Sequence, residues 1–367
     1  MISKRTGGWL SFILVNGALA IMVLLWTVPT FGLFISSFRP KEEILTTGWW
    51  TVFPHKEWVK VEELRAKDLN LDTKGEMTIA GVTGTFKEFR EGIETPDGKR
   101  VKWIGNRRLG RIEIQEYKWT VNWNFTLENY RQVLMGKEIE IKKPDGSVEV
   151  IPGENFIGSF LNSVAVAIPS TVIPILIAAF AAYGFAWMQF SGKRLFFILV
   201  VALLVVPLQI ALVPILRDYA KLNINGTFLA IWLAHTGFGL PLAVYLLFNY
   251  ISTLPRETLE SAFIDGASHF TVFTRLVLPL SVPALASFAI FQFLWVWNDY
   301  LVALIFLGGN KENQVLTMHL ANLVGSRGND WHLLTAGAFV TMLLPLIIFF
   351  SLQRYFIRGL LAGSVKG

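Results

Sequence analysis

Long apolar stretches dominate the chain, and one extended polar segment interrupts them. A helix needs roughly 20 apolar residues to cross a bilayer core of about 30 Å. Six stretches meet this requirement, at residues 9–37, 158–188, 195–216, 228–250, 281–306 and 333–353. The polar segment 39–155 lies between the first two. The pattern predicts an all-α polytopic membrane protein with six transmembrane helices and a small, mostly β insertion.

Turn signals divide the insertion into short strands. Lys137 to Pro152 alternates apolar and polar residues on either side of Pro-Asp-Gly, which is typical of a β-hairpin. Thr95-Pro96-Asp97-Gly98 marks a second turn, so we expect a β domain at about 55–122. A short helix at about Leu127–Leu134 should follow it. Two roles stay open for the insertion, a spacer that supports assembly or a docking surface for a partner.

Charge is concentrated in the same insertion. Between Arg39 and Glu154 there are 20 basic and 20 acidic residues, which leaves 13 basic and 7 acidic residues for the rest of the chain. The net charge of +6 therefore comes from the membrane part, which argues against a nucleic-acid partner. The chain has no cysteine, so disulfides and thiolate metal sites are excluded, and no other metal-ligand pattern is present.

Short loops indicate the orientation. With a cytoplasmic N-terminus, the cytoplasmic segments hold nine Lys and Arg residues, against four in the short outer loops. This bias predicts cytoplasmic termini and an outer insertion. The first stretch is too long for a cleaved signal peptide and lacks a small-residue cleavage site, so we expect a retained helix.

The segment 251–280 has a helical pattern of its own. Pro255 suits a first helical position and Glu257 a first turn. Leu259, Ala262, Phe263 and Gly266 then share one face, and Gly266 can end the helix. We expect a short amphipathic helix whose apolar face nothing else in the loop covers. The alternative is an ordinary helix lying among lipid headgroups.

This segment resembles the EAA loop of bacterial ABC-importer permeases. Glu260-Ser261-Ala262 corresponds to the Glu-Ala-Ala opening, and Gly266, nine further residues and Leu276-Val277-Leu278-Pro279 complete the motif, with Ser261 and Leu276 as its two departures. In that family the loop sits in a cleft of a separate ATPase. The resemblance therefore implies an ATPase-coupling set of Glu260, Ser261, Ala262, Phe263, Asp265, Gly266, Leu276 and Pro279.

Further segments are similar to the MalG-type subunit of maltose-type sugar importers, and the long insertion looks more like the permeases of α-glucoside importers. The segments are Asn155–Ser163, Phe190–Arg194, Trp295–Tyr300 and Gln353–Gly367. The resemblance implies the ABC type I importer permease fold in the bacterial inner membrane. The implied partners are a MalF-like second permease, an ATPase homodimer, a periplasmic sugar-binding protein and the lipid bilayer. ATP and Mg would be bound by the ATPase, because this chain has no P-loop and no cofactor of its own.

The expected domains follow from these observations. They are an N-terminal tail with the first transmembrane helix (1–38), a periplasmic insertion (39–155), a five-helix permease core (156–353) containing the coupling loop (251–280), and a cytoplasmic tail (354–367). In the family this tail reaches the ATPase interface, which implies contacts at Arg358, Gly359, Gly363 and Lys366.

A few polar residues lie within the predicted spans. Asp299 is the only acid there, and Trp297, Asn298 and Asp299 form a candidate translocation path for a di- or oligosaccharide. The alternatives are a pairing or gating role for Asp299 and a packing role for Trp295 and Trp297. We expect His235, Gln209 and Asn162 to be satisfied polar residues inside the bundle.

Three protein classes remain to be compared. A non-catalytic permease subunit of an ATP-driven sugar importer accounts for the loop and the spans. An ion-coupled secondary transporter would need more buried charges than one acid. A membrane-anchored enzyme or receptor would place its active part in 39–155, where His55 is the one histidine and no acid–base cluster is evident.

Overall fold

A computed structural model describes residues 4–69, 71, 75–107, 110–136, 139–142, 148–151, 156–323 and 330–362. Contacts divide the chain into two compact units, which meet in sequence between Thr126 and Leu127. The second unit therefore begins within the segment expected to form the insertion, ahead of residue 156. Each unit is described by itself.

The first unit begins with a long apolar helix. Its leading helical elements are α1 (Lys4–Ser37), α2 (Lys41–Thr46) and the 3₁₀ turn η1 (Trp49–Val52). Arg39, which is 1% exposed, joins them by donating to the carbonyl oxygen of Thr47 at 3.2 Å. Glu43 lies 3.8 Å from the Arg39 guanidinium and accepts from the side-chain amides of Asn122 at 2.9 Å and Asn124 at 2.7 Å. This network fixes the end of α1 to the segment that leaves the β sheet.

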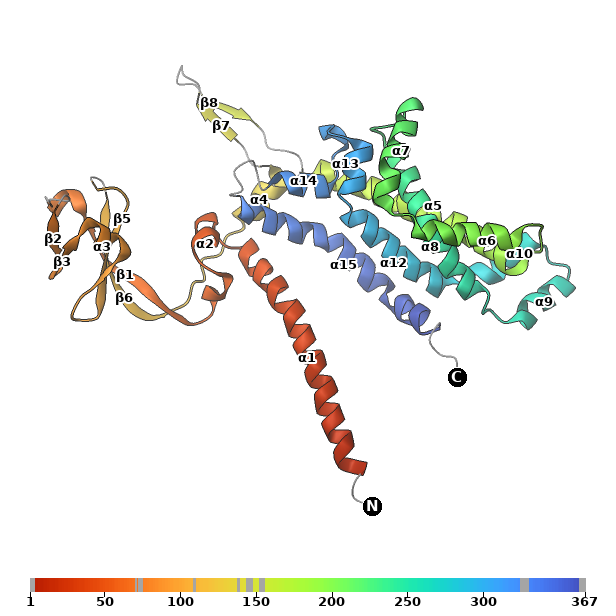
Figure 1. Cartoon of the computed structure of the whole chain (residues 1–367), viewed down its shortest axis with the longest axis horizontal. Helices are drawn as coiled ribbons and strands as arrows, with labels where there is room; N and C mark the ends of the chain where they lie inside the picture. Colours follow the sequence, from red (N-terminus) through yellow and green to blue (C-terminus); the bar gives the residue numbers. More distant parts are fainter. Residues whose placement is uncertain are drawn as a thin grey trace. The chain divides into compact units, whose positions relative to one another are not determined.

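The expected β domain is confirmed. Its elements are β1 (His55–Arg65), η2 (Ala66–Leu69), β2 (Glu76–Ile79), β3 (Val82–Thr85), α3 (Phe86–Glu91), β4 (Ile93–Glu94), β5 (Lys99–Ile104) and β6 (Arg111–Thr120). Four strands form an antiparallel sheet in the order β1-β6-β5-β4, beside the β2-β3 hairpin (Figure 1). The core is small and centred on Phe89, Val101, Trp103 and Ile112.

The turn at Thr95–Gly98 is also confirmed. The Gly98 amide donates to the carbonyl oxygen of Thr95 at 2.9 Å, and Gly98 has a φ of +80°. In the second unit, the hairpin predicted around Pro-Asp-Gly is present as β7 (Ile139–Lys142) paired with β8 (Val148–Ile151), and its turn lies outside the described residues. The predicted short helix is α4 (Glu128–Met135).

Helices make up most of the second unit. They are α5 (Phe156–Trp187), α6 (Lys193–Ala202), η3 (Leu203–Val205), α7 (Leu208–Lys221), α8 (Phe228–Ile251), α9 (Arg256–Ile264), α10 (His269–Val272), the π-helical turn η4 (Phe273–Val277), α11 (Leu278–Leu280), α12 (Val282–Asn298), α13 (Leu301–Leu307), η5 (Lys311–Asn313), α14 (Leu316–Leu323) and α15 (Trp331–Ala362). Helix α5 packs along α8, and α12 packs against α5, α8 and α15.

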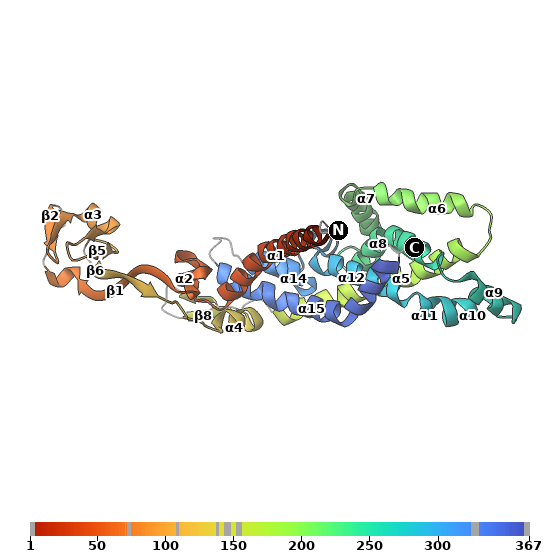
Figure 2. The ribbon, with the colours of Figure 1, turned by 90° about the horizontal axis from the view of Figure 1, so that it is seen from below.

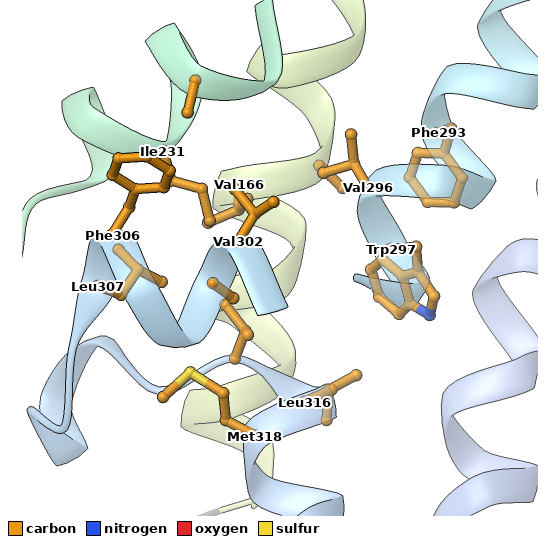
Figure 3. Close-up of a cluster of buried hydrophobic side chains, with 14 of the residues drawn as sticks. Val166, Ile231, Phe293, Val296, Trp297, Val302, Phe306, Leu307, Leu316 and Met318 are labelled. Atoms are coloured by element: carbon orange, nitrogen blue, oxygen red, sulfur yellow. The ribbon is translucent and has the colours of Figure 1, made fainter. Parts of the chain in front are cut away.

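Two hydrophobic cores lie within this bundle. One joins α5, α8, α12 and α13, and Figure 3 shows Val166, Ile231, Val296, Val302 and Phe306 converging in it. The other surrounds buried alanines of α5 and extends to α9 and the π-helical turn. The alanine side chains are single methyl groups, so α5 and α8 can approach closely there.

Four described helices, α1, α5, α8 and α15, are long and apolar enough to cross a membrane, or six if each of two bent pairs is one span. One pair is Lys193–Val205 with Leu208–Lys221, bent by 104°, which Figure 2 shows as α6 and α7 meeting at an angle. The other is His269–Leu280 with Val282–Asn298, bent by 71°. The 104° bend lies within the predicted span 195–216, whereas the 71° bend lies at the start of the predicted span 281–306. The latter span is interrupted further on, between α12 and α13. The prediction of a continuous helix was therefore wrong for both stretches.

Backbone chemistry accounts for the break at Pro207 and for the break between α12 and α13. Pro207 has no amide to donate and disfavours a helical conformation at Val206, which is extended with a ψ of 116°. Asp299 is also extended, with a ψ of 125°, so α12 ends at Asn298 and α13 begins at Leu301.

Candidate functional site

Helix α9 forms where the loop pattern predicts it. Pro255 is the N-cap, one position earlier than expected, and Glu257 lies in the first turn. At the other end the amides of Gly266 and Ala267 donate to the carbonyl oxygens of Phe263 at 3.0 Å and Ala262 at 2.9 Å. This pair of bonds is a Schellman motif, and it requires the φ of +84° that Gly266 adopts.

The apolar face of α9 is covered, contrary to expectation. Leu259 is 0% exposed and belongs to the second core, together with Val272 and Phe273 of the following turns. Ala262 and Phe263 are partly buried against the same core, and the Phe263 ring lies 4.9 Å from that of His269. Residues later in the loop and on neighbouring helices supply this cover, and the helical pattern of α9 alone does not reveal them.

The outward face of α9 is different from the predicted one. Ile264 is 85% exposed, and Glu257, Glu260, Ser261 and Asp265 are exposed around it. The exposed hydroxyl of Ser261 is already bonded to the carbonyl oxygen of Glu257 at 2.7 Å. Ile264 was missed by sequence reasoning, although an isoleucine between Phe263 and Asp265 off the apolar stripe is a visible signal. The face available to a partner is therefore an apolar side chain surrounded by carboxylates.

The second half of the loop runs from α10 into α12. The Tyr183 hydroxyl lies 2.9 Å from Nδ1 of His269 and so joins α10 to α5. Phe270 is 67% exposed, which adds a second apolar side chain to the outward surface of the loop. Leu276 is partly buried within the π-helical turn, and Pro279 is exposed in α11. The structure thus places the motif residues in one continuous segment, half of which is anchored and half exposed.

The predicted tail contacts are only partly described. Arg358 and Gly359 lie in the last turns of α15, and Gly363 and Lys366 lie outside the described residues.

The three candidate path residues have different surroundings. Trp297 is 4% exposed, stacks on Phe293 at 5.4 Å and donates from Nε1 to the carbonyl oxygen of Thr341 at 3.1 Å (Figure 3). Asn298 is exposed, and its side chain donates to the carbonyl oxygen of Leu294 on its own helix at 2.8 Å. In this conformation Trp297 packs the bundle and presents no free ring face.

Asp299 connects two helices, whereas the sequence pattern had placed it inside one. Its Oδ1 accepts from the amides of Leu301 at 3.1 Å and Val302 at 3.3 Å, which caps α13. Its carbonyl oxygen accepts from the Thr317 hydroxyl at 2.8 Å, and Oδ2 lies 3.5 Å from Nε2 of His235. Asp299 therefore holds the α12–α13 break against α8 and α14.

The polar residues of the bundle are unequally satisfied. Asn162 donates to the carbonyl oxygens of Glu312 at 2.7 Å and Gln314 at 3.0 Å, as expected for a satisfied amide. Gln209 is exposed. His235 is 0% exposed, yet among the described residues neither ring nitrogen has a hydrogen-bond partner, so that expectation was wrong. Buried polar atoms without partners are costly and need another explanation than packing.

Comparison with known proteins agrees with a membrane transport component. The family model described as binding-protein-dependent transport system inner membrane component matches residues 157–361. The osmoprotective compounds uptake permease protein GgtD of Synechocystis is 48% identical, over 95% of this chain and 90% of its own length. The alpha-glucoside transport system permease protein AglG of Rhizobium meliloti is 46% identical, over 96% of this chain and 97% of its own length.

Two further comparisons cover less of the chain. The arabinooligosaccharides transport system permease protein AraQ of Bacillus subtilis is 34% identical over 57% of this chain and 73% of its own length. A solved bacterial ABC transporter for the acidic polysaccharide alginate superposes with a TM-score of 0.46 at 13% identity, over 55% of this chain and 79% of that one. From the family match over more than half of the chain and the two nearly full-length relatives, we conclude that this chain belongs to the binding-protein-dependent transport system inner membrane components, as a non-catalytic permease subunit of an ABC importer.

Proposed function

We propose that the chain forms one half of an inner-membrane pathway for an α-glucoside, and that a separate ATPase drives it through the loop 251–280. The observation that carries the substrate class is the extent of the match to AglG, which includes the β domain as well as the bundle. AraQ, in contrast, matches 57% of this chain. The two nearly full-length relatives have different named substrates, so an osmoprotective compound is the second candidate.

The remaining partners follow from the same proposal. A MalF-like permease completes the pathway, an ATPase homodimer contacts the loop and the tail, and a periplasmic sugar-binding protein delivers the substrate. The positive-inside bias supports cytoplasmic termini and a periplasmic β domain.

The outward face of α9 supports the coupling role. Ile264 is the kind of apolar side chain that fills a pocket on a partner, and Glu257, Glu260 and Asp265 would surround it with negative charge. The Schellman motif closes the C-terminal end of α9, and buried Leu259 anchors the middle of the helix to the bundle, so the helix can act as a stiff lever. Binding energy is then transmitted to the spans and is not lost in unwinding.

The test is uptake of a radiolabelled α-glucoside such as maltose or trehalose by cells that carry the complete importer. Deleting the gene for this chain should abolish uptake, and the wild-type gene should restore it. Glu260→Lys should insert in the membrane at wild-type levels but lose uptake and uncouple ATP hydrolysis from sugar. Glu62→Lys, which reverses an exposed charge in the β domain, is the matched control. Normal import by Glu260→Lys would overturn the coupling assignment, and uptake of an osmolyte but of no α-glucoside would overturn the substrate class.

A further inference from the structure

A hollow of 560 Å³ lies within the second unit, between α7, α8 and α12 beside the break at Pro207. Most of its lining is apolar, and its polar groups come from Asp218, Tyr219, Gln292 and Trp295. Its volume is within the range of about 300–1,000 Å³ typical of small-molecule sites, which also combine apolar walls with a few placed polar groups. None of the three candidate path residues at 297–299 lines it.

One wall is an aromatic ring held in place from behind. Trp295 is partly buried, and the ring of His235 stands perpendicular to it, with centroids 5.3 Å apart and planes at 88°. His235 in turn lies against Asp299, the cap of α13. The buried histidine, which had no evident role of its own, therefore fixes the orientation of a tryptophan that faces the hollow.

A second wall carries a positioned amide. Gln292 is 3% exposed, and its Nε2 donates to the carbonyl oxygens of Ser170 at 3.1 Å and His235 at 3.4 Å. No hydrogen bond to its Oε1 is found among the described residues. A Cβ at Gly239 would lie 2.5 Å from that oxygen, so glycine is needed for the amide to keep its place. The arrangement leaves the amide oxygen as an acceptor at the hollow.

We propose that this hollow is a sugar-binding site on the transport route, which rests on the proposed function. The Trp295 ring would pack against the apolar C–H face of a glucosyl ring, and Oε1 of Gln292 would accept from a sugar hydroxyl. Asp218, at the exposed end and paired with Lys221 at 3.4 Å, would accept from further hydroxyls. The occupant is a neutral glucoside, and not a lipid chain, because a lipid tail would leave the amide oxygen of Gln292 without a donor.

Gly237 offers a direct test because it lines the hollow and a Cβ there would meet nothing within 4 Å. Gly237→Leu adds volume to the hollow and also favours the helix. It should reduce α-glucoside uptake at least about tenfold, which corresponds to about 1.4 kcal/mol of lost sugar binding. Gly184→Leu on α5 is the matched control, because that helical glycine does not line the hollow and its Cβ would meet only the Met188 sulfur, at 4.0 Å.

Thiol labelling in the intact complex gives a second readout. The chain has no cysteine, so Gly237→Cys creates a single labelling position in this chain, and Gly184→Cys is again the control. Maltose with its binding protein should slow maleimide labelling at position 237 but not at 184. If labelling at 237 is slow with and without sugar, a lipid or the partner permease fills the hollow and the inference fails. The inference also fails if the wild type imports the sugar and Gly237→Leu imports it equally well. If the wild type imports no α-glucoside, the proposed function fails instead.

The aromatic wall is tested by a graded pair. Trp295→Phe keeps a ring for the sugar and should retain most uptake, whereas Trp295→Leu should lose about five- to tenfold, equivalent to roughly one favourable aromatic contact. Expression and membrane insertion are measured for both variants. Equal uptake by the two variants would show that no sugar ring is recognised at Trp295.

Discussion

Replacing Leu259 by alanine should release α9 from the bundle without touching its outward face. Leu259 is 0% exposed and is the one residue of α9 that is fully buried. The change removes about three carbon atoms, each equivalent to about 0.8 kcal/mol of apolar burial, and leaves a cavity. Buried Leu→Ala replacements accordingly cost about 3–5 kcal/mol. Because α9 is short, the whole loss weakens the docking of this helix against the bundle. The fraction of molecules in which α9 is undocked should rise on the order of 100-fold or more.

Hydrogen exchange of the amides in Arg256–Ile264, measured on the assembled complex, reports this opening directly. Leu259→Ala should accelerate exchange throughout α9 and lower the amount of sugar imported per ATP hydrolysed. Ile264→Ala is the matched control because that side chain is 85% exposed. It should leave the free energy of α9 opening, as measured by exchange, within about 0.5 kcal/mol of the wild-type value, as surface changes usually do. It should nevertheless weaken ATPase binding. Unchanged exchange in Leu259→Ala would falsify the view that this leucine anchors the lever.

Three further outcomes are expected. Gly266→Val should destabilise the end of α9 by about 1–2 kcal/mol or more, because a β-branched residue is strained at a φ of +84°. It should therefore impair uptake more than Gly266→Asn, because asparagine tolerates that conformation. Equal uptake by both variants would count against the Schellman cap. Asp299→Ala should lower the thermal stability of the complex by the equivalent of about 0.5–2 kcal/mol through loss of the α13 cap, whereas Asp299→Asn, which keeps an acceptor, should be close to wild type. Hydrogen bonds from the backbone amide and then the hydroxyl of Thr85 hold the pKa of Glu88 below its ordinary value of 4.5. The cap of α3 is therefore fully stabilising above pH 4.5 and weakens as the pH falls through the lower pKa of the folded state. Hydrogen exchange of α3 should show this acid sensitivity in the wild type and lose it in Glu88→Gln.

The local pattern predicted helix α9 well and its environment poorly. Pro255, Glu257 and Gly266 specify where α9 begins and ends through backbone chemistry that acts within a few residues. The cover over Leu259 comes from the later turns of the loop and from α5 and α8, which are distant in sequence. A helical pattern shows which face is apolar, but it does not show what lies against that face.

The membrane part shows a similar limit. Apolar stretches predict spans, yet both Pro207 and Pro214 occur in one stretch, and only Pro207 ends a helix. Pro214 is accommodated inside α7, so proline alone does not identify the break. Gln292 was not singled out, because its importance depends on Gly239 and Ser170, which three separate helices bring together.

The π-helical turn at Phe273–Val277 determines how the loop is aimed. A π turn holds about one residue more than an α turn, so everything before it is rotated by roughly 100° relative to a continuous α-helix. The direction in which Ile264 and Phe270 point is thus determined by winding in the five residues before α11, independently of the angle at which α12 crosses the bundle. Deleting one residue from Phe273–Val277 would restore α-helical winding and turn the outward face away, while every side chain of that face stayed unchanged.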